Sequence, residues 1–202
     1  MKFISVVSSC HNEEDNVEEL YSQVRSIFRD LNVYNYEHIF IDNASQDKTV
    51  PILKRLAKED KNLKIIVNIK DFGQNRSPCY ALLQSKGDAV ILMAADFQDP
   101  PELIKAFIAR WEEGYKIVLG IKEKSKENFV ICTIRKLYYF LINKFSDVPQ
   151  IKNFSGFGLY DRTFIDIIRK IDEPSPYLRG LVADFGTEMT EIKFVKPKRR
   201  KG

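Results

Sequence analysis

Along the first 120 residues, short apolar runs alternate with longer segments whose apolar positions recur at helical spacing. The runs lack the polar alternation of a half-exposed strand, which is typical of strands that are covered on both faces. They lie at residues 3–7, 38–41, 63–67, 89–95 and 116–119. Between them, the spacing predicts helices over residues 17–31, 50–58, 75–86 and 101–113. This alternation predicts an α/β fold with a doubly wound, mostly parallel sheet and helices on both faces.

Polar turns follow the predicted strands. In a doubly wound sheet, ligands bind beyond the carboxyl ends of the strands, so we expect these turns to form one hydrophilic cleft. Their candidate residues are Ser8, Cys10, Asn12, Glu13, Asp42, Ser45, Asp71, Gly73, Asp96, Gln98 and Asp99. The chain has neither Gly-x-Gly-x-x-Gly nor Gly-x-x-x-x-Gly-Lys, which argues against a dinucleotide-binding fold and a P-loop.

The turn after the fourth strand carries the strongest chemical signal. Asp96, Gln98 and Asp99 follow an apolar run, and Pro100 and Pro101 then suit the first turn of a helix. Carboxylate and amide oxygens on a strand-to-helix turn suit a divalent cation and a diphosphate. An acidic helix N-terminus that faces water would give the same pattern, and this segment alone leaves both interpretations open.

Charge and composition narrow the class of protein. The net charge of +4 arises largely from residues 196–202, so the body is close to neutral and nucleic-acid binding is not expected. Three cysteines without close pairing, together with only two histidines, favour a reducing compartment and argue against a zinc site. Residues 129–142 fall short of the roughly 20 residues that a membrane span needs. They predict either a core helix or an amphipathic helix on a membrane surface.

Four of the turns and two later segments resemble motifs of family 2 glycosyltransferases with a GT-A fold. The matching segments are residues 6–14, 41–49, 70–73, 95–102, 156–162 and 177–181. The segment Asp-Phe-Gln-Asp-Pro-Pro-Glu is similar to a motif of the dolichol-phosphate mannosyltransferase-like branch, which makes polyprenyl-phosphate sugars. The resemblance covers nearly the whole chain. It departs at Ala94, where the family has the first acid of Asp-x-Asp, and at Asn43, where a second Asp is usual.

The resemblance implies an inverting glycosyltransferase that moves a sugar from a nucleotide sugar, expected to be a UDP-sugar, to a polyprenyl phosphate or another cell-envelope glycan precursor. Within one domain over residues 1–195, residues 1–120 would bind the donor and residues 121–195 would face the acceptor. The basic tail would precede membrane helices, which places the protein in the cytoplasm at the membrane surface. Two alternatives are a sugar nucleotidyltransferase, whose usual Gly-rich first loop is missing here, and a nucleotide-binding domain that has lost catalysis, suggested by Ala94.

The resemblance also implies a cation site. Mg²⁺ or Mn²⁺ would be held by Asp96, Gln98 and Asp99 and would neutralise the leaving diphosphate as a Lewis acid. Asp96 is the first catalytic candidate, and Asp161, with Asp184 behind it, is a fallback general base. A phosphate acceptor needs no base, because it is already anionic near neutral pH.

The same resemblance implies a nucleotide site along the first four turns. Asp42 would accept hydrogen bonds from the base or ribose, or would only form its turn. His11 is expected to pack beside the base. The diphosphate would meet Arg179, Lys198 and Arg200. The expected nucleotide-binding residues are Ser8, Cys10, Asn12, Glu13, Asp42, Ser45, Asp71, Gly73 and Asp96.

Overall fold

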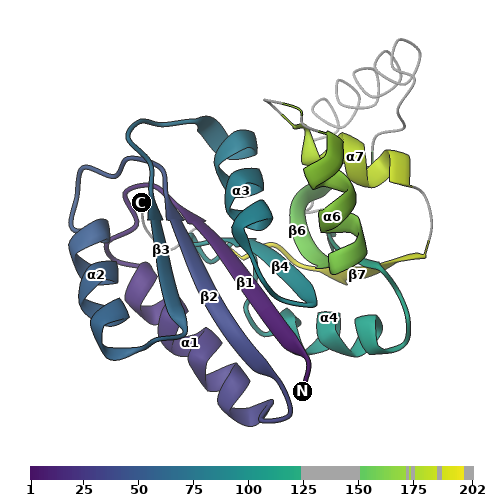
Figure 1. Ribbon diagram of the computed structural model, residues 1–202, viewed down its shortest axis with the longest axis horizontal. Coiled ribbons are helices and arrows are strands. Elements are labelled where there is room, and N and C mark those ends of the chain that lie inside the picture. The colour runs from purple at the N-terminus through teal and green to yellow at the C-terminus, as the bar shows by residue number, and fades with distance from the viewer. Residues whose placement is uncertain (124–150, 172, 174–175, 186–187, 198–202) are drawn as a thin grey trace.

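The computed structural model describes residues 1–123, 151–171, 173, 176–185 and 188–197 (Figure 1). Its strands are β1 (Phe3–Cys10), β2 (Asn35–Asp42), β3 (Leu63–Val67), β4 (Ala89–Ala94), β5 (Ile117–Lys122), β6 (Phe154–Asp161) and β7 (Met189–Phe194). Its helices are α1 (Val17–Asp30), α2 (Thr49–Glu59), α3 (Gly73–Gln84), α4 (Leu103–Glu112), α6 (Arg162–Ile171) and α7 (Leu178–Phe185).

The strands form one sheet in the order β3-β2-β1-β4-β6-β5-β7. Within this sheet β6 runs antiparallel to β4 and β5, while β1 pairs in parallel with β2 and β4, and β5 with β7. The predicted doubly wound, mostly parallel sheet is confirmed. Because β4 and β5 both oppose β6, they point the same way, and their carboxyl ends lie at the same edge of the sheet.

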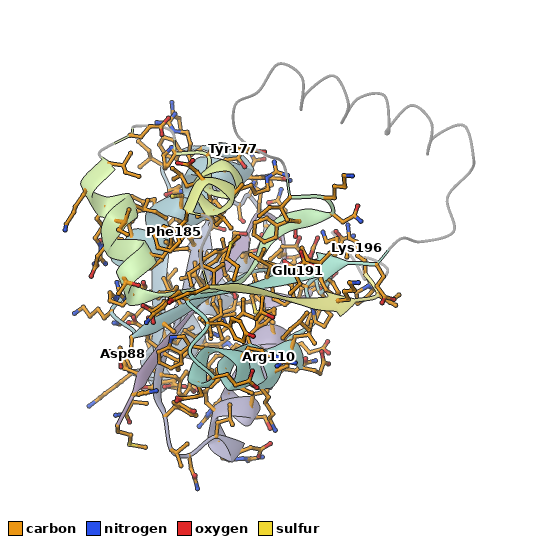
Figure 2. All side chains as sticks on the ribbon, turned by 90° about the vertical axis from the view of Figure 1, so that its right-hand side faces the viewer. Asp88, Arg110, Tyr177, Phe185, Glu191 and Lys196 are labelled. Carbon is orange, nitrogen blue, oxygen red and sulfur yellow. The ribbon has the colours of Figure 1, made fainter. Side chains whose placement is uncertain are left out.

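Both faces of the sheet are buried. Along β1, Val6 packs in the apolar cluster under α1, α2 and α4, while its neighbour Val7 packs in the cluster under α3, α6 and α7. Figure 2 views the sheet from β7, with Arg110 of α4 below that strand. Tyr177, which precedes α7, and Phe185, the last residue of α7, lie above it. Burial on both sides explains why the strands read as unbroken apolar runs.

The expected elements of the first 120 residues are confirmed, with ends that shift by a few residues. The second strand begins earlier, at Asn35, and the third helix runs over Gly73–Gln84 instead of 75–86. The helix considered for residues 129–142 lies outside the described residues. None of the described helices combines the length and the apolar composition that a membrane span requires.

A polar pair lies inside the sheet directly behind the turns. The His38 side chain is buried, and its Nε2 lies 2.9 Å from the Ser8 hydroxyl. Its Nδ1 has no hydrogen-bond partner among the described residues. Because burial disfavours a charged imidazole, the pKa of His38 falls from 6.5 to about 3.

This lowered pKa predicts an acid-sensitive fold. The unfolded chain takes up a proton at His38 below pH 6.5, whereas the folded chain resists it down to about pH 3. The contribution of His38 to the unfolding free energy is therefore fully present above pH 6.5 and decreases as the pH falls toward about 3. Between pH 7 and pH 5 the loss in unfolding free energy should be about 2 kcal/mol. Urea unfolding across this range should show the slope, and a folded His38→Gln variant should have a flatter one; an unchanged slope would assign the titration to another group.

Candidate functional site

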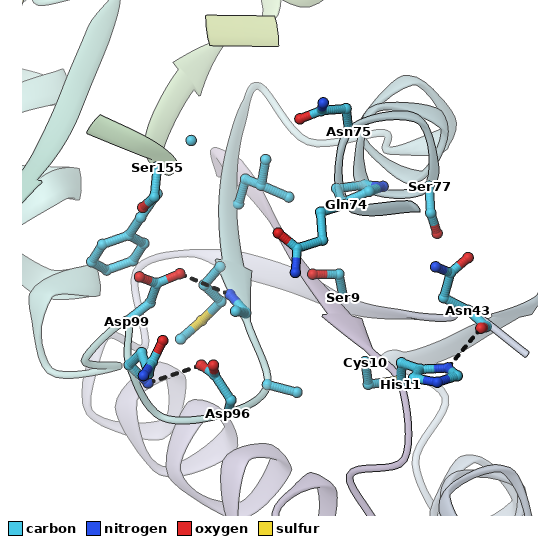
Figure 3. A pocket seen from close by; sticks show the side chains of 18 of the residues that line it. Ser9, Cys10, His11, Asn43, Gln74, Asn75, Ser77, Asp96, Asp99 and Ser155 are labelled. Carbon is cyan, nitrogen blue, oxygen red and sulfur yellow. Dashed lines mark hydrogen bonds between the residues drawn. The ribbon is translucent and has the colours of Figure 1, made fainter. Parts of the chain in front are cut away.

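A cavity of about 510 Å³ opens at the carboxyl edge of the sheet (Figure 3). Its floor comes from the ends of β1 and β4, and its walls from the turn after β2, the start of α3, the end of β5 and the start of α7. The convergence of strand-end turns expected from the sequence is therefore present. The cavity-lining residues used below are Ser9, Cys10, Glu13, Asn43, Gly73, Gln74, Asn75, Pro78, Asp96, Gln98, Asp99, Lys122, Arg179 and Lys196.

The side-chain amide of Asn43 joins the turn after β2 to the turn after β3. Its Oδ1 accepts hydrogen bonds from the Phe72 backbone N–H at 2.9 Å and from Asn68 Nδ2 at 3.1 Å. Its Nδ2 donates to Asp71 Oδ1, which also accepts the Gly73 backbone N–H at 2.7 Å. The arrangement needs a side chain that both donates and accepts, which an amide provides and a carboxylate does not.

A second set of bonds joins the turns after β1 and β2. Asn12 Oδ1 accepts the Gln46 N–H, and the Asn12 N–H donates to Ser45 Oγ, each at 2.8 Å. Asp42 is fully buried and accepts from both the backbone N–H and the hydroxyl of Ser45. Its carboxylate is therefore engaged in the turn, and its side chain does not line the cavity. This geometry favours the turn-forming role for Asp42.

The turn after β4 presents two carboxylates in different environments. Asp96 Oδ1 accepts the Gln98 N–H, and Asp99 Oδ2 accepts the Ala94 N–H, each at 3.0 Å. Asp99 is buried, and burial raises its pKa to about 6, although the Ala94 N–H opposes this shift. Both carboxylates line the cavity (Figure 3). Asp96 is only partly buried, whereas Asp99 is buried and bound to the backbone of its own turn.

Three cations face these carboxylates. Arg179, at the start of α7, lies with its guanidinium 5.2 Å from the centre of the Tyr177 ring, and its buried Nε has no partner among the described residues. Lys122 ends β5 and Lys196 follows β7. Burial lowers the pKa of Lys122, against the attraction of Asp99. Lys122 was not predicted from the sequence, although its position at a strand end was the available signal.

Several predicted residues lie elsewhere. Ser8 is buried against His38, and the side chains of Asn12, Ser45 and Asp71 build the turns without lining the cavity. Cys10, Glu13 and Gly73 do line it. Asp184 is exposed on α7, away from the cavity lining. The predicted diphosphate contacts Lys198 and Arg200 lie outside the described residues.

Asp161 does not reach the cavity. It ends the antiparallel strand β6 and pairs with Ala89, the first residue of β4, so it lies at the opposite edge of the sheet. There it accepts a hydrogen bond from Trp111 Nε1 at 2.7 Å and another from the Thr163 hydroxyl at 2.6 Å. The structure therefore gives it a packing role, and it is not retained as a catalytic candidate.

The residues at the turn after β4 fit a divalent cation that is held mainly by its phosphate ligands. Within the described ranges, no group of three or more His, Cys, Asp or Glu side chains could hold a metal. Ala94 leaves a methyl group where a second carboxylate would stand. Mg²⁺ can nevertheless bind through one carboxylate together with phosphates and water, which Asp96 and the Gln98 amide would allow.

Exchanging Asn43 and Asp71 tests the hydrogen bond that joins the turn after β2 to the turn after β3. Asn43→Asp should lower the unfolding free energy by about 1–3 kcal/mol, because it removes a donor and places two carboxylates together. The double variant Asn43→Asp with Asp71→Asn restores one donor and one acceptor, and should recover most of the loss in urea unfolding. A double variant no more stable than Asn43→Asp would show that the pairing itself contributes little.

Comparison with known proteins agrees with this geometry. The family model described as glycosyl transferase family 2 matches residues 5–172. The uncharacterized glycosyltransferase YkcC of Bacillus subtilis is 31% identical, with 98% of this chain and 61% of that protein covered. The bactoprenol glucosyl transferase of Shigella phage SfV is 29% identical, with coverages of 98% and 65%. The chain thus spans less than two thirds of the length of these relatives.

Solved structures share the fold at low sequence identity. Glucosyl-3-phosphoglycerate synthase of Mycobacterium tuberculosis, in complex with Mn²⁺, UDP and phosphoglyceric acid, matches with a TM-score of 0.66 and 17% identity, covering 100% of this chain and 72% of that one. TarS 1–349 of S. aureus with UDP-GlcNAc gives 0.62 and 17%, covering 98% and 59%. The predicted GT-A architecture is confirmed, and the extent of the family match shows that this chain belongs to glycosyl transferase family 2.

Proposed function

We propose that this chain is the catalytic domain of an inverting glycosyltransferase that moves a sugar from a UDP-sugar to a polyprenyl phosphate. The observation that carries the proposal is the cavity in which Asp96 faces Lys122, Arg179 and Lys196 at the carboxyl edge of the sheet. Carboxylate and cationic side chains around one hollow suit a ligand that combines hydroxyl groups, a diphosphate and a metal ion. The uridine nucleotides bound by two structural neighbours support the choice of donor.

Arg179 is the side chain best suited to the diphosphate. Its buried Nε–H has no partner among the described residues, and an unpaired buried donor is costly until a ligand satisfies it. The guanidinium also lies over the Tyr177 ring, which limits its freedom. An arginine held in this way can donate two parallel hydrogen bonds to phosphate oxygens. Lys122 and Lys196 would add charge from the other walls of the cavity.

A divalent cation, Mg²⁺ or Mn²⁺, belongs to the proposal. Asp96 would be its only carboxylate ligand, with Gln98 beside it, and the ion would stabilise the charge on the departing diphosphate. Asp99 is less suited to this role, because its Oδ2 already accepts the Ala94 N–H and its burial disfavours the ionised form.

The lining carboxylates support a phosphate acceptor over a hydroxyl acceptor. Asn16 donates to Glu13 Oε2, Ala94 donates to Asp99, and we assign Asp96 to the cation. None of the three is thereby left as an evident general base, which a hydroxyl nucleophile would need. A phosphate monoester is already anionic near neutral pH. The similarity to bactoprenol glucosyl transferases supports a lipid-linked acceptor of this kind.

Transfer of labelled sugar into a lipid extract tests the function. A panel of UDP-sugars is incubated with Mn²⁺ and either a polyprenyl phosphate or the corresponding polyprenol, which lacks only the phosphate. We expect a labelled glycolipid with the phosphate and none with the alcohol. UDP binding without transfer to any acceptor would instead support the second candidate, a nucleotide-binding domain that has lost catalysis, which Ala94 in place of an acid favours.

Two asparagine substitutions separate the carboxylates of the turn after β4. Asp96→Asn should abolish the gain in UDP affinity that Mn²⁺ provides, because the ion loses its charged ligand. Asp99→Asn is the matched control, since the asparagine keeps an oxygen that can accept the Ala94 N–H. Calorimetry with UDP, with and without Mn²⁺, measures both. A folded Asp96→Asn variant with the full Mn²⁺ dependence would remove Asp96 from the cation site.

A further inference from the structure

A second hollow lies on the other side of α3 from the cavity. Its volume is about 430 Å³, and its lining is largely apolar. Several side chains around it are unusually exposed for their type: Ile69 is 93% exposed, Tyr80 52% and Val67 47%. We call this surface the β3–α3 patch and define it by Val67, Ile69, Lys70, Phe72, Arg76 and Tyr80.

The exposure of Ile69 is built into the turn. The neighbouring Asn68 donates to both Asn43 Oδ1 and Ser77 Oγ, at 3.1 and 2.9 Å. On the other side, Asp71 and the Phe72 N–H are bound to the Asn43 amide. The two residues between these anchors, Ile69 and Lys70, form the tip. Because both ends of the tip are held by hydrogen bonds, a large apolar side chain is presented to solvent.

Cations surround the apolar centre of the patch. Lys70 Nζ lies 5.2 Å from the centre of the Phe72 ring, and the Arg76 guanidinium lies 5.7 Å from the same centre. Asp71, the residue after the tip, is exposed, and its Oδ1 accepts hydrogen bonds from Asn43 Nδ2 and from the Gly73 N–H. Glu173 is the acid that lines the hollow. The two cations are therefore matched in number by two exposed acids, but neither cation forms a salt bridge with an acid of the described residues, whereas Asp71 is already bound by two donors.

We propose that the β3–α3 patch binds the surface of an anionic lipid bilayer. A protruding aliphatic side chain, aromatic rings and flanking cations are the groups that enter the boundary between acyl chains and headgroups. The cations would contact anionic lipids, each contributing about 1 kcal/mol near the membrane surface. A second copy of this chain, pairing through the edge strand β3, is the competing occupant, but Lys70 and Arg76, which lie against the Phe72 ring without an acidic partner among the described residues, favour anionic lipid.

Helix α3 lies between the cavity and the proposed bilayer contact. Gln74, Asn75 and Pro78 line the donor cavity, whereas Arg76 and Tyr80 line the second hollow. One helix, about 10 Å across with its side chains, would therefore separate the bilayer from the donor. Bilayer binding at this patch would bring a lipid-linked acceptor close to the cavity. This consequence rests on the proposed function. Vesicle binding needs neither nucleotide nor sugar transfer, so the two proposals can fail separately.

Vesicle sedimentation tests the patch. The purified chain is mixed with vesicles of phosphatidylcholine alone or of phosphatidylcholine with phosphatidylglycerol. We expect binding to the anionic vesicles that weakens as salt rises. Ile69→Ser should lower the partition coefficient roughly tenfold, because one buried aliphatic side chain is lost. Lys70→Gln and Arg76→Gln should each lower it roughly fivefold.

Matched controls come from the opposite edge of the sheet. Val33 is 64% exposed in the connection between α1 and β2, and Arg29 is an exposed cation of α1. Val33→Ser and Arg29→Gln should bind vesicles like the parent chain. Absence of binding by the folded parent, or equal losses in patch and control variants, would overturn the proposal. So would light scattering that shows Ile69→Ser dissociating an oligomer while vesicle binding is unchanged, because the patch would then join copies of this chain.

Discussion

The hydrogen bonds of the Asn43 side-chain amide are the interaction on which both proposed binding surfaces depend. Parallel strands bring the turns after β2 and β3 to the same edge, but backbone pairing ends with the strands and leaves the turns unfixed. One side chain then supplies an acceptor to Phe72 and Asn68 and a donor to Asp71. The bonds set one wall of the cavity and also hold the tip that exposes Ile69. The departure from the usual acid at Asn43 therefore has a structural reason, since Asp71 requires a donor opposite it.

The fold was predictable where the apolar periodicity identifies each element and where strands and helices alternate along the chain. The first four strands and their helices satisfy this condition, because each strand is followed by a helix that packs against the sheet. The insertion of β6 between β4 and β5 does not, since it follows both in the chain and runs against them. What marks β6 is the close approach of its backbone to β5, not a periodic pattern of apolar residues. A Cβ on Gly158 would lie 2.4 Å from the Val118 carbonyl oxygen. That contact is visible only once the strands are paired.

The sequence predicted which turns form the candidate site, but it did not predict which side chains of those turns line the cavity. Along β1, Ser8 contacts the buried His38 while Ser9 lines the cavity, because successive residues of a strand face opposite sides of the sheet. The motif that suggested Asp161 is present, but the reversed direction of β6 carries its end to the far edge. Lys122 was missed for the complementary reason: β5 is parallel to β4, so its last residue arrives beside the turn of Asp96 although the sequence holds them apart.

Charge balance in the cavity bears on how a nucleotide sugar is held. Among the described lining residues, the cations Lys122, Arg179 and Lys196 are matched in number by the carboxylates Glu13, Asp96 and Asp99. The diphosphate brings further negative charge, which increases when the sugar leaves, and unpaired charge in a partly buried site is costly. The side chains alone do not neutralise that excess, whereas a divalent cation carried with the diphosphate would. The loss of an acid at Ala94 then shifts ligation toward the phosphates, so metal and nucleotide are expected to bind as a unit.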